Sequence, residues 1–454
     1  MCELMYAITA KIIFPEGLVP GEGTSSNTIR IARDGIGRPV LRGTTIAGIL
    51  RHAYGELNQN DDGACWFGKK ANENDLDNSS PFTASDAVIS IGDASIYQRT
   101  HNAINRHTCA PVKGALYSME ALPPGSSALF FFTLSVNKER QAEAESFVVS
   151  IGTILKNEVV FGGNGNRGVG RALLDGELLM QSYDVSSDKG YSAWLDMIYR
   201  NRKEGITIQG VPVRANMDLD VLKINLSLIV PRGEDIVIGD HHGLDFDLEP
   251  QTVRFTDGTQ HFRIPGSTLR GVIRSWMTRL AARDGCSIRD SFENFEDSQD
   301  SYKSDDIAWG FVSQNERKVY LENPNSLNDP VMSLFGSMYS KGRIHISDAF
   351  SLVTNNSDIH VRQHVAVDRF SGGSNEGALF ANKVLASSRH EFVVSITINA
   401  PTEKEVVWLQ KTLRALHMGI LAIGSSKASG RLAIKTLTAH GHHCEKFSAL
   451  QKEL

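Results

Sequence analysis

Residues 43–57 read GTTIAGILRHAYGEL and residues 266–280 read GSTLRGVIRSWMTRL, so the chain carries nearly the same segment twice. A constant shift of 223 positions aligns the two segments without a gap. Apolar residues recur with the spacing of one helix face, and a glycine followed by two hydroxyl residues stands at each entrance. Each segment therefore predicts a glycine turn that leads into an amphipathic helix. The free N–H groups at such a helix start suit a phosphate.

The features around these two segments also follow one order in both halves. They are strand candidates at Met5–Phe14 and Val221–Val230, Asp-Ala pairs at 93–94 and 348–349, and glycine-rich turns at 162–171 and 424–431. The order strand, helix, strands, helix, strand predicts an α+β fold in each half, with a ferredoxin-like antiparallel sheet and helices on one face. The chain is therefore expected to hold two tandem copies of one domain.

The lengths of the repeats predict a first domain over residues 1–190, a linker over 191–218 and a second domain over 219–454. The second domain carries an acidic insertion at about 284–330, which has no counterpart in the first. Its segment 284–306 holds eight acidic and two basic residues, which is enough to account for the whole net charge of −5. The rest of the chain is balanced, with 45 basic against 44 acidic residues. A local basic groove for nucleic acid is compatible with that balance.

The amino-acid composition indicates in which cellular compartment the protein is expected. Hydrophobic residues make up 41% of the 454, and no apolar run reaches the roughly 18 residues of a membrane span. The N-terminal residues are interpreted as a first strand and not as a signal peptide. Five scattered cysteines without a C-x-x-C pair favour a reducing, cytoplasmic environment.

Longer motifs resemble the RAMP superfamily of CRISPR-associated proteins. The closest resemblance is to backbone subunits of type III effector complexes, fused as two copies in the manner of type III-D-like systems. The motifs that carry it are IPGSTLRGVIR at 264–274 with its looser copy VLRGTTIAGILR at 40–51, LFGSMYSKGRIHISDA at 334–349, RQHVAVDRFSGGSNEGALF at 362–380, and the glycine-rich loop near the end of each half.

The resemblance implies two RRM-like domains with long insertions and a thumb hairpin in each, expected at 106–118 and 362–380. The implied partners are a guide CRISPR RNA, a single-stranded target RNA and other subunits of the effector complex. Such subunits hold the guide, kink the duplex beside each thumb and cleave the target there as endoribonucleases. A non-catalytic RNA-binding scaffold and a guide-processing endoribonuclease are the alternatives.

The family's cutting aspartate lies in the loop between the first strand and the helix entrance. In the first half Asp34 is the candidate, although a gapless count places Asn27 at the family position, and Asp34-Gly35 is also a common turn dipeptide. In the second half Asp245 follows Gly-Leu and is preferred over Asp247. Such a carboxylate would orient a 2′-hydroxyl or hold a divalent ion, Mg²⁺ or Mn²⁺, against a phosphate. Asp34 and Asp245 are the expected ligands of that transient ion.

RNA contacts are expected at the helix entrances, the glycine loops and the thumbs. Contacts to the sugar-phosphate chain carry no sequence information, which suits a protein whose guide varies. An apolar side chain at a thumb tip is suited to wedge between bases. The predicted contacts are Gly43, Thr44, Thr45, Arg51, Arg106, His107, Asn164, Asn166, Arg167, Arg171, Gly266, Ser267, Thr268, Arg270, Arg274, His364, Arg369, Phe370, Ser425, Ser426, Lys427 and Arg431.

Overall fold

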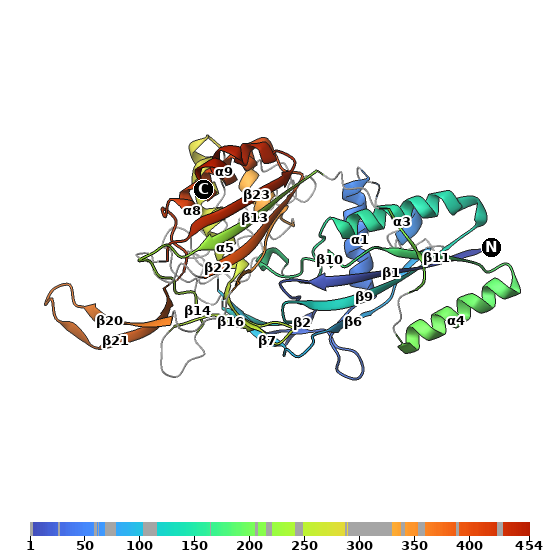
Figure 1. The fold of residues 1–454 in the computed structure, drawn as a ribbon, viewed down its shortest axis with the longest axis horizontal. Helices are drawn as coiled ribbons and strands as arrows, with labels where there is room; N and C mark the ends of the chain where they lie inside the picture. Colours follow the sequence, from blue (N-terminus) through green and yellow to red (C-terminus); the bar gives the residue numbers. More distant parts are fainter. Residues whose placement is uncertain are drawn as a thin grey trace, which may run out of the picture.

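The protein is described by a computed structural model, in which two sheets of similar plan lie side by side and a long hairpin projects from the second (Figure 1). The described residues are 3–25, 28–58, 61, 63–68, 79–102, 116–163, 165–204, 208–214, 220–240, 248–286, 288, 329–336, 341–352, 359–386, 390–424 and 430–454.

The first half is built on a sheet in the order β12-β11-β1-β9-β6-β4, with β10 paired to β1 and β5 paired to β9. All of these pairings are antiparallel. Its strands are β1 (Leu4–Phe14), β4 (Val40–Leu41), β5 (Phe82–Ala84), β6 (Ala87–Ser90), β9 (Ser126–Val136), β10 (Leu173–Leu174), β11 (Leu179–Asp184) and β12 (Val211–Pro212). Its helices are α1 (Gly43–Leu57), α2 (Ala64–Phe67) and α3 (Gln141–Lys156).

The second half repeats this plan in the order β16-β17-β19-β22-β13-β23, with β18 paired to β22. Its strands are β13 (Val221–Ile229), β16 (Thr252–Arg254), β17 (Gln260–Ile264), β18 (Ile344–Ile346), β19 (Ala349–Ser351), β22 (Glu391–Asn399) and β23 (Ala433–Gly441). Its helices are α5 (Gly266–Arg283), α7 (Pro330–Phe335), α8 (Glu403–His417) and α9 (Ser448–Glu453). The short pair β14 (Gly239–Asp240) and β15 (Glu249–Pro250) lies outside this sheet.

The two sheets share a common run of strands, because the order β4-β6-β9-β1-β11 in the first corresponds to β17-β19-β22-β13-β23 in the second, whereas β10, β12 and β16 have no counterpart. The first strand of each half lies at the centre, with β1 between β9 and β11 and β13 between β22 and β23, and β9 and β22 each precede the second long helix. This is the strand order of the split βαβ plan. The α+β fold with tandem ferredoxin-like domains is therefore confirmed.

Alternating side chains explain the packing of each half. In β1, Tyr6, Ile8 and Ile12 point into the core beneath the helices, whereas Ala7 faces the other side. Ile46 and Leu50 of α1 enter the same core, and Leu269 and Ile273 of α5 enter the second one. None of the helices in the described ranges has the length and apolar character needed to cross a membrane.

The predicted linker 191–218 contains regular structure that joins the first half. Helix α4 (Asp188–Glu204) lies on the face of the sheet opposite α1 and α3 (Figure 1). Trp194 and Met197 of α4 pack there against Phe131 and Tyr183. The apolar face of this helix therefore covers the second side of the sheet. Of the predicted acidic insertion, only residues 284–286, 288, 329 and 330 are described.

Two further strand groups extend from the sheets. The first half carries a small sheet in the order β2-β3-β8-β7, formed by β2 (Gly21–Ser25), β3 (Thr28–Ile31), β7 (Tyr97–His101) and β8 (Tyr117–Ala121). The second half carries the projecting hairpin of β20 (Ile359–Val367) and β21 (Ser374–Leu385). This hairpin confirms the thumb that was predicted over 362–380. Most of the thumb predicted over 106–118 lies outside the described residues.

One pairing expected between the halves was wrong. Leu41 pairs with Ala87 between β4 and β6, as Ile264 pairs with Ala349 between β17 and β19. The counterpart of Asp348-Ala349 is therefore Asp86-Ala87, and not the pair at 93–94. Sequence order alone could not choose between the two Asp-Ala pairs, because both follow the first helix.

Candidate nucleic-acid interface

The two helix entrances share one local geometry. The N-cap residues of α1 and α5, Arg42 and Pro265, make no capping hydrogen bond with their own side chains. Instead, the N–H of Gly43 donates to Oδ1 of Asp86 over 2.7 Å, and the N–H of Gly266 donates to Oδ1 of Asp348 over 2.7 Å. An aspartate from the neighbouring strand thus satisfies the first free N–H group and places negative charge at the positive end of the helix.

The entrance in the second half is buried against the first half. The side chains of Asp348 and Arg99 are 0% and 2% exposed, and they form an ion pair that joins the two halves. Nη2 of Arg99 donates to Oδ1 of Asp348 over 3.1 Å, and Nη1 of Arg263 lies 3.8 Å from Oδ2. Burial opposes the charge on Arg99, but Asp348 outweighs that effect and raises the pKa of Arg99.

The glycine loop of the first half completes this contact. The carbonyl of Gly168 accepts the N–H of Asp348 over 2.9 Å. A Cβ on Gly266 would stand 2.7 Å from Cα of Gly168, so the two glycines allow the backbones to meet. The predicted phosphate cradle of Gly266, Ser267 and Thr268 is therefore partly occupied by protein, since the N–H of Thr268 also donates to Pro265.

The entrance in the first half has the same parts but faces solvent. The side chains of Asp86, Arg42 and Glu22 are 49%, 41% and 55% exposed and form a surface ion-pair cluster. The Gly43 N–H, followed by Arg42, lowers the pKa of Asp86. Thr44 and Thr45 are exposed beside it. Residues 165–171 cover the entrance at Gly266. Among the described residues, no segment of the second half covers the entrance at Gly43 in this way.

A second ionic link joins the halves at the base of the glycine loop. Arg171 pairs with Glu16 over 2.6 Å and with Glu158 over 3.2 Å, and Glu158 also pairs with Lys223 of the second half over 3.2 Å. Glu158 has a φ of 65°, a left-handed conformation that non-glycine residues rarely adopt. Arg171, predicted to contact RNA, is therefore committed to the joint between the halves.

Asp34 lies in a turn, as the alternative interpretation of Asp34-Gly35 as a turn dipeptide predicted. Its Oδ1 accepts the N–H groups of Ile36 over 3.1 Å and Arg38 over 2.8 Å, and its Oδ2 accepts Nε of Arg38 over 2.8 Å. The Arg38 side chain is the main reason that the pKa of Asp34 is lowered. The Asp34 carboxylate is therefore engaged within its own turn.

Several predicted residues lie outside the described part of the chain. They are Asp245, Asp247, Arg106, His107, Asn164, Ser425, Ser426 and Lys427. Glu249, just after the aspartate pair, forms an ion pair with Lys383 over 3.1 Å. Within the described ranges, no group of three or more His, Cys, Asp or Glu side chains is placed to hold a metal ion.

The remaining predicted arginines differ in exposure. Arg270 is turned inward, donates to the carbonyls of Phe335 and Ile344, and has its pKa lowered to about 9 by burial and by Arg274 and Arg167. Arg51 and Arg274 are half-buried on their helices. Arg431 is half exposed and pairs with Glu234 over 3.0 Å.

Asn166 and Arg167 lie in the short 3₁₀ helix η2 (Gly165–Arg167) of the first-half glycine loop. The guanidinium of Arg167 lies 4.8 Å from the Tyr117 ring centre. The backbone carbonyl of Arg167 accepts a hydrogen bond from Nη2 of Arg99. The loop thus lies at the joint between the halves, next to the predicted first thumb.

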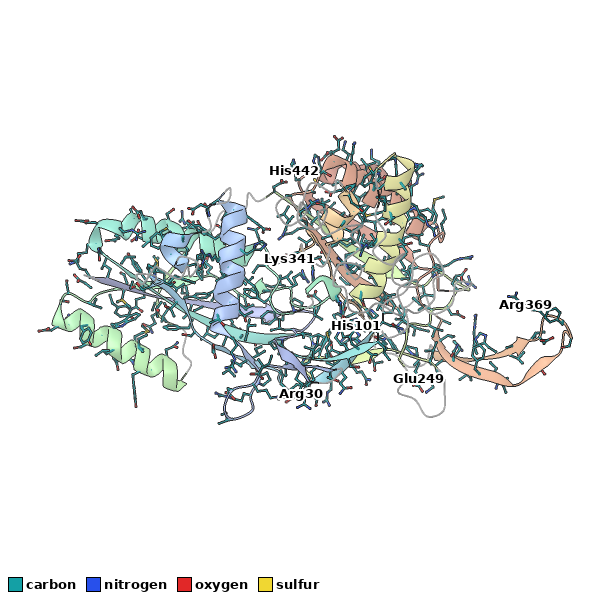
Figure 2. The ribbon with its side chains drawn as sticks, turned by 180° about the vertical axis from the view of Figure 1, so that it is seen from behind. Arg30, His101, Glu249, Lys341, Arg369 and His442 are labelled. Atoms are coloured by element: carbon teal, nitrogen blue, oxygen red, sulfur yellow. The ribbon has the colours of Figure 1, made fainter. Side chains whose placement is uncertain are left out.

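The second thumb presents its predicted contacts to solvent. Phe370 is fully exposed at the tip, next to Arg369, which Figure 2 shows at the far end of the hairpin. Asp368 fixes the tip by accepting the N–H groups of Phe370 and Ser371. Farther down, His364 stacks on Phe380 with 4.9 Å between ring centres. The tip therefore carries an exposed ring and a cation on a defined turn.

Sequence reasoning missed the residues that join the halves. Asp348 lay inside a quoted motif but received no role, and Arg99 lay in a stretch without a motif. Their pairing spans 249 positions, so no local pattern could have revealed it. His101, on the same strand as Arg99, is labelled near the joint in Figure 2. Burial and then Arg99 lower its pKa to about 3.

The match to a family model agrees with this two-part organisation. The model of the RAMP superfamily matches residues 17–173 and 234–431, which lie in the first and second half respectively. The chain belongs to the RAMP superfamily. That membership supports a CRISPR-associated, RNA-binding subunit of a ribonucleoprotein complex in general terms. A search among curated proteins gives no significant match.

Proposed function

We propose that this RAMP protein is a guide-RNA-binding backbone subunit of a type III CRISPR ribonucleoprotein, which positions and cleaves a complementary target RNA. The observation that carries the proposal is the docking of the first-half glycine loop onto the helix entrance of the second half. It places two equivalent domains in a fixed head-to-tail order. A repeating protein surface of this kind suits consecutive stretches of one RNA strand.

The open entrance of the first half supports a place among other RAMP subunits. At this entrance, Asp86 binds Gly43 and Arg42. Asp348 binds Gly266 in the same way at the second entrance, which the first-half loop covers. We propose that a neighbouring subunit brings a glycine loop to this corner, with a cation that takes the part of Arg99. The complex would operate in the cytoplasm, to which the scattered cysteines point.

RNA binding is assigned to surfaces that remain exposed after this docking. The hairpin tip offers Phe370 as a wedge between bases and Arg369 as a phosphate contact. Arg431 adds a half-exposed cation. Because these groups address backbone and stacking, they bind guides of any sequence.

Cleavage is assigned to the loop carboxylates, with Asp245 and Asp247 in the second half and Asp34 in the first. Asp34 would first have to release Arg38, since its two oxygens are held in the turn. In this role a carboxylate orients or deprotonates the 2′-hydroxyl that attacks the adjacent phosphate. A divalent ion, Mg²⁺ or Mn²⁺, would be held by Asp245 in the second half and by Asp34 in the first.

The test is cleavage of a labelled target by the complex assembled with guide RNA. Asp34→Ala, Asp245→Ala and Asp247→Ala are introduced in turn, and each catalytic residue is expected to remove one discrete cut. Arg38→Met is the matched control for Asp34, because it removes the side-chain bond to Oδ2 but keeps the carboxylate. Persistence of every cut in all three variants would leave the non-catalytic scaffold as the function. Cleavage of the guide precursor by the isolated protein would favour the processing enzyme.

A further inference from the structure

The base of the second-half hairpin is attached to both flanks of the loop that carries the candidate aspartates. That loop spans residues 241–247, which lie outside the described part of the chain, between β14 and β15. Just before β14, Ile236 and Leu385 of β21 exchange two backbone hydrogen bonds of 2.9 and 3.0 Å. Just before β15, the carbonyl of Leu248 accepts the N–H of Lys383 of β21 over 2.9 Å. One strand of the hairpin therefore holds the loop on both sides.

The Lys383 side chain adds a further contact on the C-terminal flank. Its Nζ lies 3.1 Å from Oε1 of Glu249, and the two side chains are 30% and 33% exposed. Figure 2 shows Glu249 near the base of the hairpin. A half-exposed ion pair adds at most about 1 kcal/mol to the stability of a domain. Loss of this pair is therefore expected to change the position of the loop and to leave the domain folded.

The first half has a contact at the equivalent position. In each half an antiparallel bridge and a parallel pairing join the loop flanks to one strand, and these are Leu18–Leu122 with β3–β8 in the first half and Ile236–Leu385 with Leu248–Asn382 in the second. Glu120 and Lys383 both stand two residues before the antiparallel bridge. They therefore occupy equivalent positions, Glu120 on β8 and Lys383 on β21.

Glu120 holds the first-half segment that leads to Asp34. Its Oε2 accepts the N–H of Ile31 over 3.1 Å and lies 3.9 Å from Nη2 of Arg33. The Glu120 side chain is 24% exposed. Its charge is opposite to that of Lys383. Both side chains nevertheless connect the strand that follows the predicted thumb tip with a flank of the carboxylate loop.

We propose that Glu120 and Lys383 are positioning residues for cleavage, each of which fixes the carboxylate loop of its own half to the strand after the thumb. The inference rests on the proposed function, since these residues act through the loop carboxylates. In the cleavage step the 2′-oxygen bonds to phosphorus and the P–O5′ bond breaks, while the carboxylate takes the 2′ proton and the 5′-oxygen takes a proton from solvent. A displacement of about 1 Å in such a geometry costs about 100-fold in rate.

The test measures cleavage of a labelled target by the complex assembled with guide RNA. Lys383→Met is expected to slow the cut that depends on Asp245 about tenfold or more, because the loop carboxylate is no longer held in place. The affinity for the target should stay within about twofold of the wild type, since the change affects the reaction and not the binding. The cut beside the first half should keep its rate.

Two rescues separate position from charge. Lys383→Glu and Glu249→Lys should each slow the second-half cut, and the double variant should restore it, because it rebuilds the ion pair with the charges exchanged. In the first half, Glu120→Leu should slow the cut that depends on Asp34. Glu120→Gln keeps an oxygen that accepts the N–H of Ile31 and should retain most of the rate.

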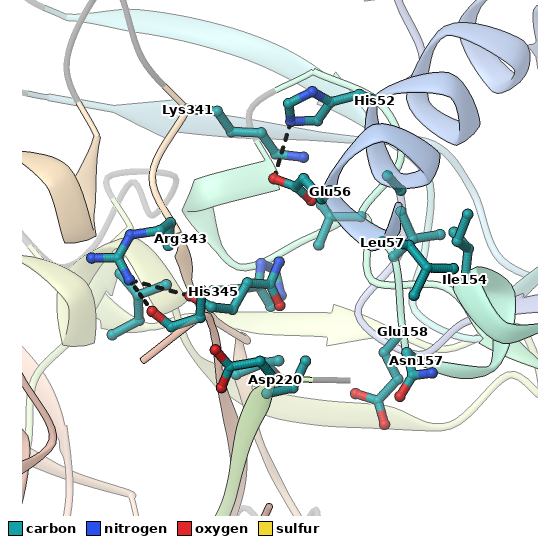
Figure 3. Close-up of a pocket in the computed structure, with 18 of the residues that line it drawn as sticks. His52, Glu56, Leu57, Ile154, Asn157, Glu158, Asp220, Lys341, Arg343 and His345 are labelled. Atoms are coloured by element: carbon teal, nitrogen blue, oxygen red, sulfur yellow. Dashed lines mark hydrogen bonds and ion pairs between the residues drawn. The ribbon is translucent and has the colours of Figure 1, made fainter. Parts of the chain in front are cut away.

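The matched control is a lysine of the same half that lies away from the hairpin. Lys341 stands at a cavity of about 320 Å³ that residues of both halves line (Figure 3), and Figure 2 shows it apart from Glu249 and the hairpin. Lys341→Met removes the same charge as Lys383→Met, so the two variants lose the same general attraction for RNA. Lys341→Met should keep the wild-type rate of every cut.

The outcomes separate the inference from the proposed function. If Asp245→Ala and Asp247→Ala leave every cut in place, the proposed function fails and the inference fails with it. The inference alone fails if these variants remove a cut that Lys383→Met leaves at its wild-type rate, or that Lys341→Met slows equally. It also fails if the charge exchange restores nothing, or if target affinity falls in parallel with the rate, because Lys383 would then be an RNA contact.

Discussion

The helix entrances at Gly43 and Gly266 are built alike but used differently. Each glycine N–H is held by an aspartate at 2.7 Å. In the second half that aspartate is fully buried and paired with Arg99 of the first half, whereas in the first half it is about half exposed and paired within its own domain. The entrance at Gly266 therefore forms part of the interface between the two halves. The entrance at Gly43 has the same local structure but remains on the surface.

Replacing Asp348 and Asp86 should give the largest difference in stability between the two entrances. Asp348→Ala leaves Arg99 buried without its counter-ion and is expected to lower the free energy of unfolding by about 3–5 kcal/mol. Asp86→Ala removes an N-terminal hydrogen bond at an exposed site and should cost about 1 kcal/mol. Urea unfolding of both variants measures the difference. Equal losses would contradict the assignment of the second entrance as the interface.

The glycine contact gives the next largest expected effect. Gly168 has a φ of 94°, and a Cβ there would overlap the Asp348 carboxylate. Gly168→Ala should destabilise the protein by about 1–3 kcal/mol and make the segment between the halves more sensitive to protease. Gly176→Ala is the matched control, because its φ of 88° is similar but its Cβ would meet nothing within 4 Å. If the two variants lose the same stability, strain and not the joint explains the cost.

The Glu158 link should appear as a pH dependence. Burial opposes its charge, but Arg171 and Lys223 outweigh burial and hold the pKa of Glu158 below its ordinary 4.5. A lowered folded-state pKa adds stability above pH 4.5, and that stability is lost as the pH falls through the folded value. The stability difference between the wild type and Glu158→Gln should therefore be present at pH 7 and shrink below pH 4.5. A difference that stays constant with pH would exclude this link.

The smallest effects are expected where the two halves are the same. Gly48 and Gly271 occupy equivalent exposed positions in α1 and α5, and a Cβ at either meets nothing within 4 Å. Gly48→Ala and Gly271→Ala should each stabilise the protein by up to about 1 kcal/mol through helix propensity. Thermal unfolding checks this. A loss at only one position would show that one helix face has a partner that its copy lacks.

The sequence predicted the tandem fold, which depends on local patterns. It did not predict the contacts between the halves, which depend on residues far apart in the chain. Helix spacing at 43–57 and 266–280 and the order of the strands were enough for the tandem fold. Asp348 and Arg99 lie 249 positions apart, and their pairing exists only after both halves have folded and docked. Arg171 and Arg270 read as RNA contacts because they stand beside glycines or on a helix face. Burial turns both toward protein partners.

Amide hydrogen exchange at the two helix entrances tests the central comparison most directly. In the free protein, the peptide with Gly266 should exchange much more slowly than the peptide with Gly43, because only the former is covered by another domain. In the ribonucleoprotein complex purified from cells, the Gly43 peptide should become protected to a similar degree. Equal protection of the two peptides in the free protein, or no change at Gly43 on assembly, would contradict this account.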